Sequence, residues 1–139
     1  MGAWGTGVFE NDAALDFCMA LDKKESVIQI GYFLTDFLAN SDEYIEIDDG
    51  QEAILCAEIV ASLFSGKSNK EAYPDDLEAW LSGNSEAVTS DLIRDALLAI
   101  ERCMAEESEL LEVWQASPMF SEWAGVVEDI KLRLKSPRP

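Results

Sequence analysis

The chain has 139 residues, of which 28 are Asp or Glu, 10 are Lys or Arg and none is His, so its formal net charge is −18 at pH 7. A surface this acidic repels nucleic-acid phosphates and anionic lipids, which argues against nucleic-acid binding and membrane binding. It attracts basic molecules over long distances, so the charge bears on partners rather than on the fold.

Length and composition predict one folded domain over residues 1–139, with a Gly-rich lead-in over 1–10 and a short tail over 136–139. The hydrophobic fraction is 48%, which is ordinary for a globular protein and excludes an acidic disordered chain. No apolar stretch reaches the ~20 residues of a membrane span, and the first residues lack the basic start of a secretory signal. Cys18, Cys56 and Cys103 are widely spaced within apolar patterns, so we expect reduced, buried thiols and a cytoplasmic protein.

The apolar spacing of the first half of the chain predicts three helices. Asn11 or Asp12 is placed to cap the first, whose apolar positions recur at intervals of three and four residues. A second helix is expected over 26–39, and its wide apolar face places it at the centre of the domain. Residues 43–47 alternate polar and apolar, but a lone strand is hard to stabilise, so we expect an extended linker. Asp48 or Asp49 is expected to cap a third helix that runs to about Phe64.

Further helices are expected in the second half. Pro74 opens a short one, a longer one starts near Ser90, and Ser108 caps a brief one. Ser117 and Pro118 form the start signal of the last helix, with the serine as cap and the proline in the first turn. The pattern therefore predicts an all-α fold, a single-domain bundle of five to seven helices with the Gly-rich N-terminal segment packed on it.

The sequence offers few means of catalysis. The absence of histidine removes the commonest general base, metal ligand and activator of nucleophiles. The cysteines lack CxxC spacing, so a thiolate zinc site is not predicted. Gly5-Thr6-Gly7 resembles the start of a dinucleotide loop, but no strand precedes it and Glu10 stands where a third glycine belongs. We therefore predict no catalytic residue, no cofactor and no enzymatic activity, and we interpret these glycines as a tight turn.

The most acidic region runs from residue 42 to residue 52. Its spacing fails the EF-hand calcium pattern, because Ile45 and Ile47 fall at ligand positions counted back from Gly50. We assign no metal ligand, and an all-carboxylate magnesium site stays an alternative. Carboxylates that surround apolar anchors are typical of a docking surface for a basic protein, whereas the other interpretation is a solvated loop whose Ile47 fills the core. The residues placed on the docking surface are Asp42, Glu43, Tyr44, Glu46, Asp48, Asp49 and Glu52.

The opening of the chain, MGAWGTGVFENDAALDF, resembles the start of a family of small bacterial proteins catalogued as a domain of unknown function. That family begins with Gly-Ala-Trp-Gly and continues with Phe-Glu-Asn-Asp, and residues 44–61 are similar to its acidic linker and following helix. The resemblance covers most of the chain, although Phe17 stands where many relatives have Trp. It implies a helical domain of bacterial origin and brings no activity or catalytic residue. The signature residues Trp4, Phe9, Asn11 and Asp12 form either a structural cap or a shared binding edge.

These observations favour a non-enzymatic binding protein whose partner is a basic protein and neither nucleic acid nor membrane. Its sharpest form is an immunity protein against a bacterial nuclease toxin, since nucleases that hold phosphate backbones present Lys- and Arg-rich clefts. We expect a monomer or a weak dimer. Two alternatives stay open: a carboxylate-based divalent-metal-binding domain or enzyme, and a protein-binding scaffold or regulator that uses an apolar groove.

Overall fold

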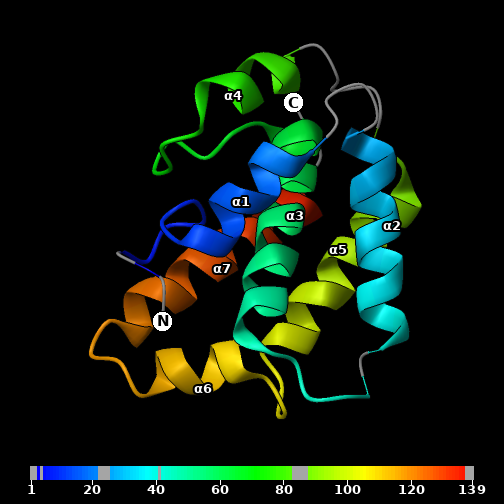
Figure 1. Ribbon diagram of the computed structural model, residues 1–139. Coiled ribbons are helices and arrows are strands. Elements are labelled where there is room, and N and C mark those ends of the chain that lie inside the picture. Colours follow the sequence, from blue (N-terminus) through cyan, green and yellow to red (C-terminus); the bar gives the residue numbers. More distant parts are fainter. Residues whose placement is uncertain (1–2, 4, 22–25, 41, 83–87, 137–139) are drawn as a thin grey trace.

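The computed structural model describes residues 3, 5–21, 26–40, 42–82 and 88–136, and over these residues the chain forms seven helices (Figure 1). The all-α prediction is confirmed. Trp4 and residues 137–139 of the predicted tail lie outside the described residues. The helices are α1 (Asp12–Ala20), α2 (Ser26–Ala39), α3 (Ile47–Ser65), α4 (Asp75–Ser82), α5 (Ser90–Cys103), α6 (Glu109–Gln115) and α7 (Phe120–Lys135).

Local signals set several helix ends as predicted. The Asn11 side chain caps α1 by accepting a hydrogen bond from the Ala14 N–H at 2.8 Å. The Ser108 hydroxyl caps α6 in the same way, accepting from the Leu111 N–H at 3.3 Å. An acceptor at this position satisfies one of the N–H groups that a helix start leaves without a partner. The bounds of α2 are also those expected from the sequence.

Two predicted starts are wrong. Helix α3 begins at Ile47, before Asp48 and Asp49, because its first N–H donates at 2.8 Å to the Glu109 carboxylate of α6. Neither aspartate is the cap, and both lie in the first turn, where the helix dipole favours a negative charge. Helix α7 begins at Phe120, because the Ser117 hydroxyl accepts from the N–H two residues on and makes a turn ahead of the helix.

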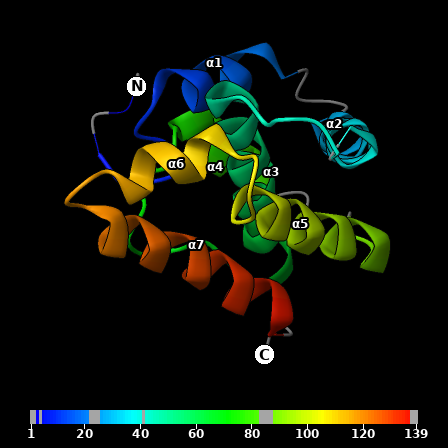
Figure 2. The same cartoon turned by 90° about the horizontal axis from the view of Figure 1, so that it is seen from below.

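The central helix is α3, which corrects the prediction that residues 26–39 lie at the centre. Helices α1, α2, α5, α6 and α7 all pack against α3 (Figures 1 and 2). Almost all of α3 after its first turn is buried, whereas α2 leaves Ile28 and Tyr32 exposed. Small side chains such as Ala53 and Ala57 let neighbouring helices approach α3 from several sides.

The remaining core joins the last helices to this centre. The Trp114 ring of α6 stacks on the Trp123 ring of α7 with centroids 5.6 Å apart, and both side chains are buried. Cys56 and Cys103 are buried, Cys18 is half-buried, and all three thiols are free. No helix in the described ranges combines the length and apolar character needed to cross a bilayer.

Candidate functional site

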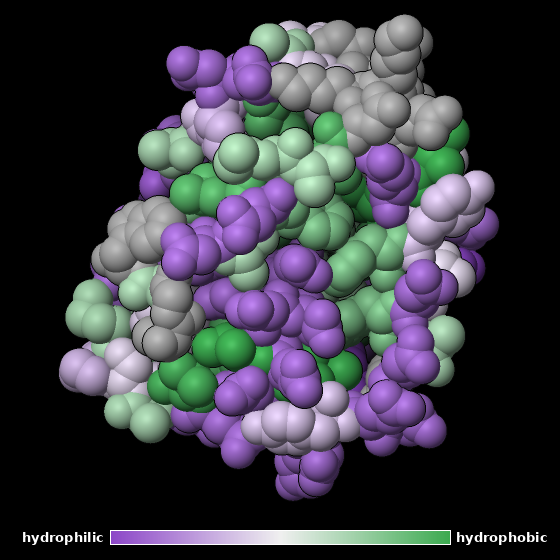
Figure 3. All heavy atoms as spheres, in the orientation of Figure 1, coloured by the Kyte–Doolittle hydropathy of each residue, from purple (hydrophilic) through white to green (hydrophobic). Residues whose placement is uncertain are grey.

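The predicted docking segment lies at the end of the molecule where α3 begins, and a second acidic segment lies beside it. Residues 42–52 contribute six carboxylates, and residues 106–112, from the α5–α6 connection and α6, contribute four more. We call this region the acidic end. Its members are Asp42, Glu43, Glu46, Asp48, Asp49, Glu52, Glu106, Glu107, Glu109 and Glu112. Hydrophilic side chains line the lower edge of the molecule near the α2–α3 connection, and hydrophobic side chains lie beside them over α6 (Figure 3).

Backbone hydrogen bonds through Ile45 hold the two acidic segments together. The Ile45 N–H donates to the Glu107 carbonyl at 2.8 Å, and the Glu109 N–H donates to the Ile45 carbonyl at 2.8 Å. These bonds form an isolated parallel bridge between Ile45 and Ser108. Ile45 is only 5% exposed, so it anchors this segment in the core, whereas Ile47 is half-buried. The expected extended linker therefore has a partner, and Ile45 takes the place in the core that the solvated-loop interpretation gave to Ile47.

Arg102 of α5 also holds the two acidic segments together. Its guanidinium donates to the carbonyls of Glu43, Glu106 and Glu107 at 2.7, 2.8 and 3.2 Å. One cation thus joins both acidic segments through their backbone carbonyls. The exposed members of the acidic end are Asp42, Glu43, Glu46, Asp48, Asp49, Glu106, Glu107 and Glu112.

Tyr44 lies among these carboxylates and is 48% exposed. Its hydroxyl donates to the Glu112 carboxylate at 2.7 Å, so it links the two segments through side chains. This hydrogen bond and the surrounding negative charge raise the pKa of Tyr44 to about 12. The ring is therefore an uncharged, partly apolar surface whose orientation is fixed by a neighbour.

Glu52 is the least exposed member of the predicted docking set. Its burial and the neighbouring charges of Asp49 and Asp48 raise its pKa. Among the described residues, no group of three or more Cys, Asp or Glu side chains is arranged to hold a metal ion.

Most cations lie away from the acidic end. The described basic residues other than Arg102 belong to the α3–α4 connection, the first half of α5 and the last turns of α7, and they are Lys67, Lys70, Arg94, Lys131, Arg133 and Lys135. Arg133 donates to the Gly66 carbonyl, at the far end of α3. A 19-residue helix is about 28 Å long, and at this far end the cations have carboxylate partners, as Lys67 has in Glu78 and Arg133 in Glu58.

Two of the N-terminal signature residues, Phe9 and Asn11, have structural roles. Phe9 is buried and packs on the Tyr73 ring with centroids 4.9 Å apart. Asn11 caps α1 and donates from Nδ2 to the Val8 carbonyl at 3.2 Å, so it fixes the preceding turn as well. Asp12 is exposed in the first turn of α1. For Phe9 and Asn11 the structure supports the cap rather than the binding edge.

The glycines of the same segment leave room for two carboxylates. A β-carbon on Gly5 or Gly7 would lie under 3.0 Å from the Glu10 carboxylate, and one on Gly7 would also meet Glu71. The Gly7 N–H donates to Glu10, and the Val8 N–H donates to Glu71, both at 3.0 Å. Both carboxylates end flexible side chains that can move aside for a β-carbon, so these contacts accompany the glycines without requiring them.

Replacing Asn11 with alanine is expected to lower the free energy of unfolding by about 1 kcal/mol, because the α1 cap and the bond to Val8 are both lost. Asn11→Ser keeps a side-chain acceptor at the cap, so we expect a smaller loss of unfolding free energy than for Asn11→Ala. Thermal unfolding followed by circular dichroism measures both variants. Equal melting temperatures for wild type and Asn11→Ala would contradict this role.

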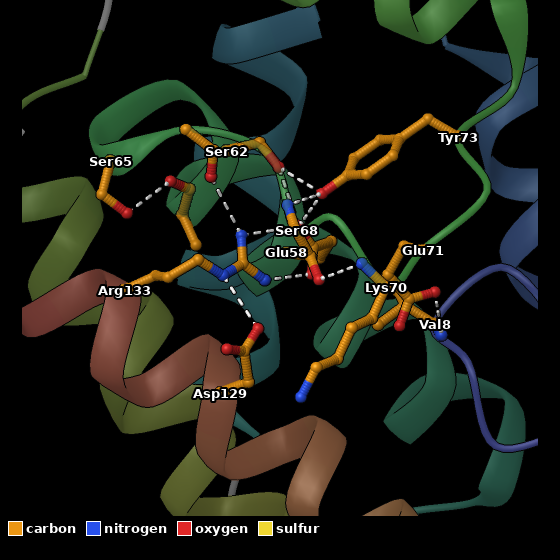
Figure 4. Close-up of polar contacts among 12 residues, drawn as sticks. Val8, Glu58, Ser62, Ser65, Ser68, Lys70, Glu71, Tyr73, Asp129 and Arg133 are labelled. Carbon is orange, nitrogen blue, oxygen red and sulfur yellow. Dashed lines mark hydrogen bonds and ion pairs between the residues drawn. The ribbon is translucent and has the colours of Figure 1, made fainter.

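A buried ionic cluster joins the second half of α3 to α7 and to the α3–α4 connection (Figure 4). Glu58 of α3 is fully buried, and the Arg133 guanidinium of α7 donates to its two oxygens at 2.9 and 2.5 Å. The hydroxyls of Ser62 and Tyr73 also donate to Glu58. Burial opposes the charge on Arg133, but the bonds to Glu58 outweigh it and raise the Arg133 pKa. Asp129, four residues before Arg133 on α7, also accepts from the guanidinium at 3.0 Å, although Arg133 itself is mostly buried.

Sequence reasoning missed the cluster and the second acidic segment. Glu58 interrupts the apolar run from Ile54 to Val60, and a lone charged residue in such a run signals a buried partner. Residues 106–112 carry four glutamates, a charge run that is visible in the sequence. Their contact with residues 42–52 depends on the fold and has no local signal.

The fold and these features define a small all-α domain with an acidic end and a single buried ionic cluster among the described residues. The family model for Domain of unknown function (DUF4259) matches residues 2–125, and the chain belongs to this family. No curated protein and no solved structure matches the chain.

Proposed function

We propose that this protein binds a basic protein through its acidic end in the bacterial cytoplasm, and that it is an immunity protein that neutralises a cationic nuclease toxin. The observation that carries the proposal is the meeting of two acidic segments, 42–52 and 106–112, around the exposed Tyr44. Three free cysteines fit a reducing compartment.

A nuclease holds its substrate with Lys and Arg side chains that line a cleft, and a rigid anionic surface can occupy the same cleft. Long-range attraction accelerates the encounter, and a neighbouring aromatic ring supplies a desolvated anchor once contact is made. Because the Glu112 carboxylate already orients Tyr44, this side chain loses less conformational freedom on binding than a free one would.

The test uses the basic nuclease domain encoded beside this protein's gene, and it measures inhibition of nucleic-acid cleavage together with the association rate. We expect inhibition at equimolar protein and an association rate that falls as salt rises. A variant that neutralises three exposed carboxylates of the acidic end, Glu46→Gln, Asp48→Asn and Glu107→Gln, is expected to associate about tenfold more slowly at low salt.

The matched control neutralises three exposed carboxylates elsewhere, Asp16→Asn, Asp75→Asn and Glu122→Gln. Its net charge equals that of the acidic-end variant, and we expect less than a twofold change in rate. The proposal fails if the neighbouring gene encodes no basic nuclease, if cleavage continues in the complex, or if the rate ignores ionic strength. Equal slowing by both variants would mean that net charge, and not the acidic end, drives association.

A further inference from the structure

A cavity of about 310 Å³ opens beside the acidic end, between α2 and the start of α3. Phe33 and Phe37 of α2 line it together with Ile45, and three carboxylates, from Asp36, Glu43 and Asp49, line it as well. The cavity thus combines an apolar aromatic wall with negative charge, and none of its lining residues is basic.

The aromatic wall is preorganised. The rings of Phe33 and Phe37 are nearly parallel, with an interplanar angle of 18° and centroids 6.1 Å apart. The Phe17 ring of α1 packs edge-on against Phe33 with centroids 5.3 Å apart. The Glu43 backbone is fixed by the Arg102 guanidinium. A ligand that enters therefore meets an aromatic wall that is already in place, which lowers the entropic cost of binding on that side.

This combination matches one kind of side chain. The methylene groups of a long cationic residue can lie on apolar surface while its charged head reaches carboxylates. A guanidinium fits better than an ammonium, because it is planar, stacks on aromatic rings and donates to carboxylates through several N–H groups. The volume lies at the lower limit of small-ligand pockets, which suits one side chain.

We propose that this cavity binds a single arginine side chain, presented by the basic partner, with its guanidinium held by Asp36, Glu43 and Asp49. This inference rests on the proposed function, because the partner that docks on the acidic end supplies the arginine. Long-range attraction alone would not distinguish one cation from another. A specific guanidinium site predicts that arginine binds in preference to lysine.

The probe is N-acetyl-L-arginine methylamide, titrated at millimolar concentrations into the full chain labelled with ¹⁵N. The matched ligands are the corresponding citrulline compound, which is nearly isosteric and neutral, and the lysine compound. We expect shift changes that map to Phe33, Phe37 and Asp49, binding of arginine in preference to lysine, and no binding of citrulline. Equal shifts for arginine and citrulline, shifts elsewhere, or tighter binding of lysine would overturn the assignment.

Two neighbouring aspartates supply the control variants. Asp48 and Asp49 both lie in the first turn of α3, but only Asp49 lines the cavity. Asp49→Asn is expected to weaken arginine binding about threefold to fivefold, and Asp48→Asn less than twofold, although both remove one charge at the same helix end. If both substitutions weakened arginine binding equally, Asp49 would make no specific contact with the guanidinium, and the cavity would not be the arginine site.

The outcome separates this inference from the proposed function. If the acidic-end triple variant slows association with the nuclease while the arginine compound shows no binding, docking through the acidic end stands and the arginine site is wrong. If the arginine compound binds as expected and the nuclease is not inhibited, the cavity is an arginine site in a protein with a different basic partner. Failure of both experiments removes both proposals.

Discussion

Replacing Arg133 with methionine is expected to lower the free energy of unfolding by about 3–5 kcal/mol, because the substitution leaves the Glu58 carboxylate buried without its cation. Glu58 is fully buried, and two of its hydrogen bonds come from the Arg133 guanidinium. The remaining donors, the hydroxyls of Ser62 and Tyr73, are neutral and do not balance the charge. Urea denaturation followed by tryptophan fluorescence measures the change.

Three further variants make this prediction specific. Asp129→Asn removes the more exposed partner of the same guanidinium and is expected to cost less than about 1 kcal/mol. Arg133→Lys keeps the charge but loses the bidentate contact with Glu58. Its loss of unfolding free energy is expected to lie between those of Arg133→Met and Asp129→Asn. Combining Arg133→Met with Glu58→Gln removes the buried charge and is expected to recover part of the loss. Equal denaturation midpoints for Arg133→Met and Asp129→Asn would show that the pair contributes little.

Much of the fold can be predicted because its signals are local. The residues that cap a helix lie within three positions of the groups that they satisfy, so Asn11 and Ser108 can be recognised from the sequence alone. The start of α3 cannot be recognised in this way, because the group that accepts from its first N–H is the carboxylate of Glu109, 62 residues away. The central helix escapes prediction for a related reason. An apolar face is visible in the sequence, whereas the number of helices that pack around small residues such as Ala57 is decided by tertiary structure.

The candidate site likewise has one part that the sequence predicts and another that depends on tertiary structure. The carboxylates of residues 42–52 are contiguous, so their combined charge is evident from the sequence alone. Their neighbours in residues 106–112 join them through the bridge between Ile45 and Ser108. The Glu58–Arg133 pair spans 75 positions. Periodicity places Arg133 next to Asp129 on a helix surface, which is correct but incomplete, since periodicity cannot show that a neighbouring helix covers that surface.

Glu71 is expected to make the protein less stable as the pH rises from about 4.5 to about 7. Burial of its carboxyl group and the nearby charge of Glu58 raise the Glu71 pKa from 4.5 to about 7, with Glu10 adding to the effect, while the Val8 N–H and Arg133 oppose it. In this pH range the folded protein keeps a proton that the unfolded chain has lost. Stability is therefore full below the lower pKa and declines toward the higher one.

The substitution that isolates this effect is Glu71→Gln, which keeps an oxygen to accept from the Val8 N–H and carries no charge. We expect the variant to match wild type below pH 4 and to be more stable by about 2 kcal/mol at pH 8, a value reduced from that of a fully buried group because the Glu71 side chain is half-buried. Urea denaturation at a series of pH values measures it. Glu122→Gln makes the same change in net charge at an exposed site on α7 and is expected to follow wild type throughout. An NMR titration of the Glu71 side-chain carboxyl carbon with a midpoint near 4.5 would remove the basis of the prediction, because the folded and unfolded chains would then lose their protons together.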